Sequence, residues 1–238
     1  MSTATGNVSA TFCATEAWRL VWAYPAPFLF GGFLLIAVSI GVPFLGTLIA
    51  GPMWVGLCAM SLKAQAGQEP TVADFFAPMG DARATASWIF GAVITAILTI
   101  ASMVGMALVM GSFFGLIAAA QGGGIADPRA FVLGTTGGFA IMLLPLVPIA
   151  YYILPAGFYI ARGGMDCFAA IRRSAGQVFR RRGFWSAFWG VMMLGHLVGM
   201  LACCIGLVVV FPWNAIAIGV GLAGSDPTLL EQAPPPIR

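Results

Sequence analysis

Residues 20–62 read LVWAYPAPFLFGGFLLIAVSIGVPFLGTLIAGPMWVGLCAMSL, a run of 43 positions without one charged side chain. A helix rises about 1.5 Å per residue, so this run would reach roughly 65 Å, twice the ~30 Å hydrocarbon layer of a bilayer. It must therefore fold back on itself. The break is expected near Pro43, because proline removes a backbone donor and restricts the residue before it. The run thus predicts two membrane-spanning helices.

Three more uncharged windows follow, at residues 84–126, 130–161 and 183–225. Apolar residues make up 60% of the chain and charged residues 8%, against about 25% charged in soluble domains. We therefore predict an all-α, polytopic transmembrane helical bundle of about six spans, with five or seven as alternatives. The expected spans are 25–42, 45–62, 87–110, 131–160, 184–204 and 206–223. Pro145, Pro148 and Pro155 predict kinks in the fourth.

The domain organisation follows from these spans. Residues 1–24 form an N-terminal cytoplasmic or interfacial segment, 25–223 the transmembrane helical domain, and 224–238 a disordered cytoplasmic tail. The first 15 residues contain no Lys or Arg, so they lack the basic start of a cleaved signal peptide, and we expect the first span to direct insertion.

Basic residues fall on one side of this predicted bundle. With six spans, that side holds Arg19, Lys63, Arg83, Arg162, Arg172, Arg173, Arg180, Arg181, Arg182 and Arg238, and the other side holds Arg129. Cytoplasmic loops carry such an excess, which predicts cytoplasmic N- and C-termini. The preference for Arg, Ala, Gly and Pro is typical of a GC-rich bacterial genome, so the expected location is a bacterial inner membrane. The small net charge of +3 indicates no nucleic-acid partner.

Two cytoplasmic loops are predicted to contain short interfacial amphipathic helices. Thr71 to Asp74 resembles a capping box that opens a helix. In the second loop the apolar side chains of Phe168, Ile171, Ala175, Val178 and Phe179 recur at helical spacing. Such a basic amphipathic helix places arginines on anionic lipid headgroups, here Arg172, Arg173, Arg180, Arg181 and Arg182. Alternatively, these arginines only set the topology.

A family resemblance rests on short motifs. Residues 51–57, GPMWVGL, followed by Ala73-Asp74-Phe75-Phe76, resemble the "GP…G…DxF" signature of uncharacterised bacterial integral membrane proteins. In the second half, Leu154-Pro155, residues 169–174, Phe184-Trp185 and Pro212 fit the same pattern. These families are similar to the membrane domain attached to some glycerophosphodiester phosphodiesterases. The resemblance covers roughly residues 17–222 and implies a six-span bundle with no established activity. We do not expect the catalytic activity here, because it would need several metal-binding acidic and His residues and this sequence has one histidine. The pattern's usual aromatic and charged exit is replaced by residues 219–224.

His196 is the single histidine, and it is predicted near the bilayer midplane, where ionisable groups are expensive and often functional. Met192, Met200 and Cys203 lie at helical spacing from it, and sulfur with imidazole suits Cu(I) or haem iron. These four residues are the speculative metal site. The alternative is structural, because methionine fills gaps in apolar packing and a neutral histidine can hydrogen-bond a neighbouring helix.

Catalytic signatures are missing. The chain contains no Walker motif, HExxH or GxSxG, and the predicted spans contain no Asp or Glu. We therefore expect a non-enzymatic membrane protein without a cofactor that binds membrane lipids, a membrane-protein partner or a second copy of itself. The alternatives are a small transporter or channel with a midplane site near His196, and an intramembrane metal or haem protein.

Overall fold

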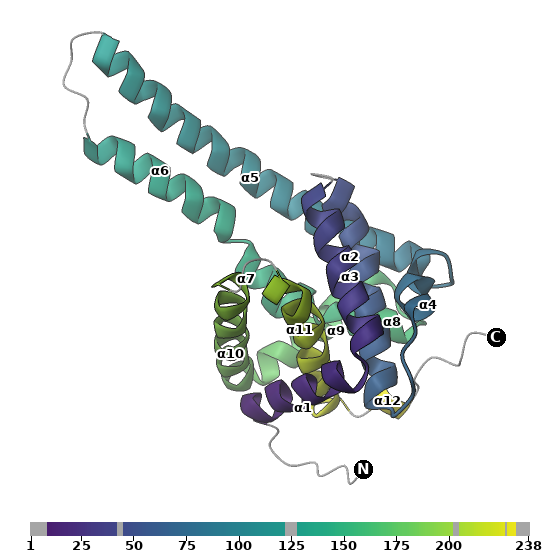
Figure 1. Ribbon diagram of the computed structural model, residues 1–238. Coiled ribbons are helices and arrows are strands. Elements are labelled where there is room, and N and C mark those ends of the chain that lie inside the picture. Colours follow the sequence, from purple (N-terminus) through teal and green to yellow (C-terminus); the bar gives the residue numbers. More distant parts are fainter. Residues whose placement is uncertain (1–8, 42–44, 122–127, 202–204, 227, 232–238) are drawn as a thin grey trace. The chain divides into compact units, whose positions relative to one another are not determined.

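The computed structural model describes residues 9–41, 45–121, 128–201, 205–226 and 228–231 (Figure 1). Every regular element within these residues is a helix, which confirms the all-α prediction. The helices are α1 (Ala10–Ala23), α2 (Pro25–Gly41), α3 (Leu45–Gln65), α4 (Val72–Phe76), η1 (Ala77–Met79), α5 (Ala84–Gln121), α6 (Pro128–Leu143), α7 (Leu146–Pro148), η2 (Ile149–Ile153), α8 (Ala156–Arg162), α9 (Cys167–Arg180), α10 (Arg182–Leu201), α11 (Ile205–Ala223) and α12 (Thr228–Glu231).

Two of these helices are long and apolar enough to cross a membrane, namely α5 over Ala84–Ala119 and α11 over Gly206–Ala223. A third span is possible if α1 and Pro25–Ser39 of α2 count as one element, although they are bent by 104° at the break between them. The chain therefore has the helices of a membrane protein. The count of six spans stays a prediction, and the expected turns near Pro43 and Cys203 lie outside the described residues.

The chain divides into two compact units, residues 1–92 with 151–238 (unit 1) and residues 93–150 (unit 2). Unit 1 is built around α3, which contacts α2, α4, α8 and α11. Every residue from 51 to 64 is buried, so α3 has no face left for solvent or lipid along this length. Such all-round burial requires an apolar helix, and the uncharged run that ends at Leu62 provides it.

Glycines let the neighbouring helices approach α3 closely. A Cβ added to Gly51 would lie 2.2 Å from the Cα of Gly91 in α5, and one added to Gly56 would lie 2.0 Å from the carbonyl oxygen of Phe75. Neither contact tolerates a side chain, because backbone atoms cannot move aside. Gly51 and Gly56 come from the GPMWVGL motif, so this motif is where α3 packs against its neighbours.

The fourth predicted span breaks at two of its three prolines. Pro145 precedes α7, and Pro155 separates the π-helix η2 from α8. The carbonyl groups at the second break are bonded by side chains of other helices in unit 1. The indole nitrogen of Trp54 donates to the carbonyl of Leu154 at 2.9 Å, and the hydroxyl of Ser174 donates to the carbonyl of Tyr152 at 2.8 Å. The carbonyl groups freed at this break are thus hydrogen-bonded, and we call the segment from Tyr152 to Pro155 the bonded bend.

Unit 2 contains the second part of α5, together with α6 and α7. Its two long helices touch at small residues, because a Cβ on Gly105 would lie 2.5 Å from the carbonyl oxygen of Gly138. Among the residues of this unit whose burial the structure describes, three are buried: Gly105, Gly138 and Ile149. Large apolar side chains such as Leu133 are exposed instead. Unit 2 therefore lacks a core of its own, as expected of helices whose surroundings are lipid.

Candidate functional site

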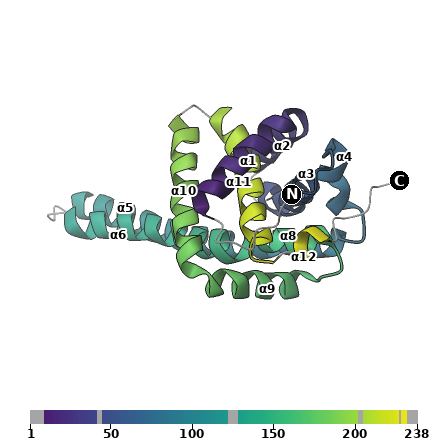
Figure 2. The same ribbon diagram turned by 90° about the horizontal axis from the view of Figure 1, so that it is seen from below.

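Helix α9 and the residues that follow it carry the arginines that the sequence assigns to lipid binding: Arg172, Arg173 and Arg180 lie in α9, Arg181 caps its end, and Arg182 begins α10. Helix α9 begins after Gly163 and Gly164, which adopt the left-handed φ values of +90° and +76° and turn the chain away from α8. Asp166 caps the helix, since its carboxylate accepts a hydrogen bond from the backbone of Ala169 at 2.9 Å. In Figure 2, α9 runs along one edge of unit 1, beside α8 and α12. The turn and the cap therefore set its direction.

The buried strip of α9 differs from the predicted apolar strip. Cys167, Ala170, Ser174 and Val178 are buried, whereas the side chains of Phe168 and Phe179 are 61% and 66% exposed. Small residues form the packed side of α9 because they let this helix lie close to α8. Of the predicted strip, Val178 is buried and Ile171 and Ala175 are half-buried. The large aromatic rings are left on the outer side.

The five arginines fall into two sets. The guanidinium of Arg173 bonds to the carboxylate of Asp226 at 2.7 Å and lies 5.1 Å from the centre of the Tyr159 ring. Arg181 donates to the hydroxyl of Ser225 at 2.9 Å. These two arginines tie α9 to the segment that follows α11, so their guanidinium groups are held by contacts within unit 1.

Asp226 is the hub of this attachment, and the sequence did not single it out. Its carboxylate accepts hydrogen bonds from Thr228 at 2.6 Å and from Tyr159 at 3.4 Å as well as the ion pair from Arg173. Burial alone would raise the pKa of Asp226, but the hydrogen bonds from Thr228 and Arg173 outweigh it and leave the pKa below its ordinary value. Asp226 is therefore ionised at neutral pH. It lies in the tail that the sequence predicts to be disordered; residues 228–231 of that tail form α12.

Arg172, Arg180 and Arg182 form the second set, which we call the free arginines. All three are exposed, and within the part of the chain that the structure describes they make no hydrogen bond or ion pair. Arg172 lies on the same side of α9 as Phe168 and Phe179, because residues 4 and 11 apart fall within about 40° of one another on a helix. This side thus combines cationic and aromatic groups.

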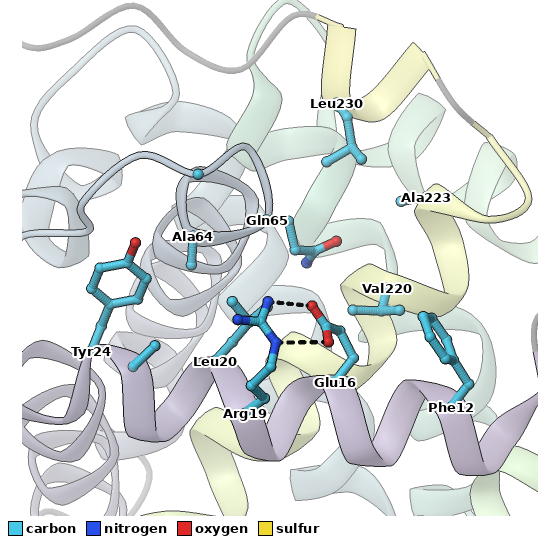
Figure 3. A pocket seen from close by; sticks show the side chains of 12 residues that line it. Phe12, Glu16, Arg19, Leu20, Tyr24, Ala64, Gln65, Val220, Ala223 and Leu230 are labelled. Atoms are coloured by element: carbon cyan, nitrogen blue, oxygen red, sulfur yellow. Dashed lines mark hydrogen bonds and ion pairs between the residues drawn. The ribbon is translucent and has the colours of Figure 1, made fainter. Parts of the chain in front are cut away.

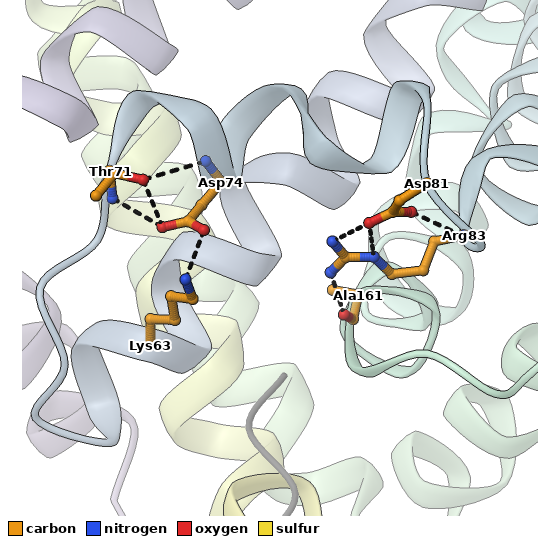
Figure 4. A network of polar contacts seen from close by, with 6 residues as sticks. All are labelled: Lys63, Thr71, Asp74, Asp81, Arg83 and Ala161. Atoms are coloured by element: carbon orange, nitrogen blue, oxygen red, sulfur yellow. Dashed lines mark hydrogen bonds and ion pairs between the residues drawn. The ribbon is translucent and has the colours of Figure 1, made fainter. Parts of the chain in front are cut away.

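A second polar cluster lies at the end of α3 (Figure 4). The ammonium of Lys63 contacts the carboxylate of Asp74 at 2.6 Å, and both side chains are buried. Asp74 also completes the predicted capping box with Thr71, whose backbone N–H donates to it at 2.9 Å. Arg83 pairs with Asp81 and donates to the carbonyl of Ala161 at 2.7 Å. These contacts fasten the first loop to the ends of α3 and α8.

His196 pairs with an asparagine of the next helix. The amide nitrogen of Asn214, a buried residue of α11, lies 3.1 Å from Nε2 of His196, and Nδ1 of His196 lies 3.0 Å from the carbonyl oxygen of Met192. Near this contact, a Cβ on Gly195 would lie 2.2 Å from the Trp213 ring. The arrangement is a contact between two helices.

The structure describes only part of the predicted metal site. Met192 is buried beside His196, whereas the side chain of Met200 and all of Cys203 lie outside the described part of the chain. Within that part, no three His, Cys, Asp or Glu residues gather as metal ligands. The geometry at His196 is therefore that of an interhelical hydrogen bond. The metal site remains a prediction.

Comparisons with protein families, with curated proteins and with solved structures find no match to this chain.

Proposed function

We propose that this chain is a multi-pass protein of a bacterial inner membrane, without enzymatic activity, whose α9 binds anionic phospholipids at the cytoplasmic face. The observation that carries the proposal is the outer side of α9, where Arg172 lies beside the exposed rings of Phe168 and Phe179, with the exposed Arg180 at the end of α9 and Arg182 at the start of α10. Aromatic rings favour the headgroup layer, and guanidinium groups bind lipid phosphates. A soluble helix would have little reason to expose both rings.

The six-span topology is part of this proposal. The spans would be α2, α3, α5, the broken element α6 to α8, α10 and α11, with α1 and α9 in the cytoplasmic interface. Contacts within unit 1 support a shared cytoplasmic end, because Arg83 bonds to the carbonyl of Ala161 at the end of α8 and Arg181 bonds to Ser225 beyond α11. The predicted one-sided distribution of basic residues requires such an end. The resemblance to membrane domains without established activity agrees with this proposal.

Retention of anionic lipid tests the binding. The triple variant Arg172→Gln, Arg180→Gln and Arg182→Gln should lose most of the phosphatidylglycerol and cardiolipin that co-purifies with the wild type in mild detergent, measured by mass spectrometry. The matched control is the double variant Arg173→Gln and Arg181→Gln, whose arginines are held by Asp226 and Ser225. For each arginine removed, this double variant should lose less anionic lipid than the triple variant. Equal retention by the triple variant and the wild type would exclude α9 as the lipid site.

Cysteine labelling tests the orientation. Gly176 lies on the exposed side of α9, and a Cβ there would have no heavy atom within 4 Å. In a variant without the native cysteines, Gly176→Cys should resist a membrane-impermeant maleimide in intact cells and react after permeabilisation. Labelling of intact cells would reverse the proposed topology.

The alternative is a small transporter with a midplane site near His196. One observation favours it: Oδ1 of Asn214 is buried without a hydrogen-bond partner in the described residues. A polar substrate or a water could bond to that atom. Asn214→Leu should abolish flux through such a site in proteoliposomes, whereas in the proposed function it should leave anionic-lipid retention unchanged.

A further inference from the structure

Unit 1 contains a cavity of about 300 Å³ at the end where α1, α3, α11 and α12 meet. Its walls are mainly apolar and include Phe12, Leu20, Val220 and Leu230. Polar side chains enter it from two helices, Glu16 and Arg19 from α1 and Gln65 from α3. Figure 3 shows both charged side chains rising from α1 toward Gln65, with Leu230 beyond them. The cavity therefore combines a charged pair with a mainly apolar lining.

The charges of this cavity cancel. Nε of Arg19 donates to one oxygen of Glu16 at 2.9 Å, and its terminal nitrogen contacts the other oxygen. These are the two charged residues among the described residues that line the cavity. The hydrogen bond from Arg19 lowers the pKa of Glu16, so both groups are ionised at neutral pH. An anion alone would have to displace Glu16 from Arg19. A ligand that carries both a cation and an anion could engage both groups.

The outer side of α1 has the composition of a headgroup-level helix. Trp18 and Trp22 are about half exposed, and their rings pack edge to face with centroids 5.6 Å apart. Aromatic pairs of this kind favour the boundary between headgroups and acyl chains. Meanwhile α1 is fixed to the bundle, because the indole of Trp213 donates to the carbonyl of Ala14 at 2.8 Å. The cavity would therefore open where phospholipid headgroups are found.

From this geometry we infer that the cavity binds the headgroup of a zwitterionic phospholipid of the phosphatidylethanolamine class. The ammonium of the ligand contacts Glu16, its phosphate contacts Arg19, and the first methylene groups lie against Leu20 and Val220. The volume is at the lower end of small-molecule sites, which suits a headgroup and excludes a whole lipid. This inference relies on the membrane location proposed above, but it concerns a different site and a different lipid from those of α9.

The test is a binding measurement on the full-length purified chain in detergent, by native mass spectrometry with dihexanoyl-phosphatidylethanolamine and dihexanoyl-phosphatidylglycerol. The wild type should prefer the ethanolamine lipid. Glu16→Gln should weaken that binding by about tenfold, because a charge-assisted hydrogen bond is lost, and should not weaken binding of the glycerol lipid, because Arg19 then has no carboxylate to give up. Ala223→Phe, which fills the cavity without touching the charged pair, should abolish it.

Further measurements distinguish binding in the cavity from binding at α9, and a phospholipid from its soluble headgroup. The variant without the free arginines should keep ethanolamine-lipid binding, so loss of anionic lipid there concerns α9 alone. Soluble phosphoethanolamine should compete weakly, since it lacks the apolar part; competition equal to that of the lipid would overturn the assignment of a phospholipid. A wild type with no preference between the two lipids would overturn it as well, and so would Glu16→Gln and Ala223→Phe variants that fold and bind like the wild type.

Discussion

Units 1 and 2 pack their apolar helices in opposite ways. In unit 1, α3 is buried on every side between residues 51 and 64, and polar groups are fastened at its end. In unit 2, α5 and α6 meet at Gly105 and Gly138, while large side chains such as Leu133 are exposed. Unit 1 supplies its own apolar surroundings. Unit 2 depends on its environment for them, so lipid matters more to its stability.

The largest effect is expected at the buried ion pair of unit 1. Asp74→Ala leaves the ammonium of Lys63 buried without its partner, which should destabilise the chain by about 3–5 kcal/mol. Asp81→Ala is the matched control, because its partner Arg83 keeps the carbonyl of Ala161. Asp81 is also the more exposed carboxylate, at 36%, so that change should cost less than Asp74→Ala. Thermal unfolding in detergent measures both, and equal losses would show that burial of the carboxylate does not set the cost in unit 1.

A charge on the exposed side of unit 2 should come next. Met103 is 68% exposed in α5, and Met103→Arg would place a guanidinium among lipid tails, at about 2.5–3.5 kcal/mol for a helix centre. Phe168→Arg on α9 is similarly exposed but lies in the proposed interface, so membrane insertion should tolerate it. Carbonate extraction of membranes from cells that express each variant gives the inserted fraction. If both variants insert equally well, the exposed side of α5 does not face lipid.

The contact between α5 and α6 should show a smaller effect. Gly138→Leu forces a side chain against the backbone of Gly105, where a Cβ already lies 2.7 Å from the carbonyl oxygen. We expect a loss of about 1–3 kcal/mol, as for other overpacked sites. Gly111→Leu is the control, since no heavy atom lies within 4 Å of its added Cβ. Chemical denaturation in mixed micelles compares them. An equal response would mean that unit 2 does not depend on this contact.

The smallest effect is a pH dependence within unit 1. The folded-state pKa of Asp226 is below its ordinary value of about 3.9. Its contribution to stability is therefore complete above about pH 4 and is lost as the pH falls toward the folded pKa. It should be about 1 kcal/mol or less, because Arg173 is partly exposed. Asp226→Asn should lose this acid dependence in unfolding experiments between pH 2 and 6, and the exposed Glu69→Gln should retain it.

Sequence patterns predicted where the helices of this chain lie better than they predicted how the helices pack. The uncharged windows located the apolar helices, and Pro145 and Pro155 located two breaks, because charge and proline act locally. Whether a helix is central or exposed depends on its neighbours. The windows of α3 and α5 are both free of charge, yet α3 is buried and α5 is exposed. Periodicity cannot distinguish them, since lipid and protein are equally apolar.

The candidate site was predicted in part for a similar reason. The run of arginines was visible, but its division into held and free sets depends on Asp226 and Ser225, more than forty residues away. One signal for that contact was present: an Asp in an otherwise uncharged stretch that ends a span. On α9, helical spacing identified an apolar strip that includes Phe168 and Phe179, whereas the side packed against the protein contains the smaller Ala170 and Ser174. Size decided the contact, and hydrophobicity alone did not predict it.

The bonded bend before α8 limits how the protein can move. Proline-broken helices in transporters act as hinges when the freed carbonyl groups are available to a substrate or an ion. Here the carbonyls of Leu154 and Tyr152 already accept hydrogen bonds from Trp54 and Ser174. Rotation about this bend would break bonds to α3 and α9 together, in surroundings that offer few replacements. The element therefore behaves as a rigid bracket, and any alternating-access motion would have to hinge elsewhere.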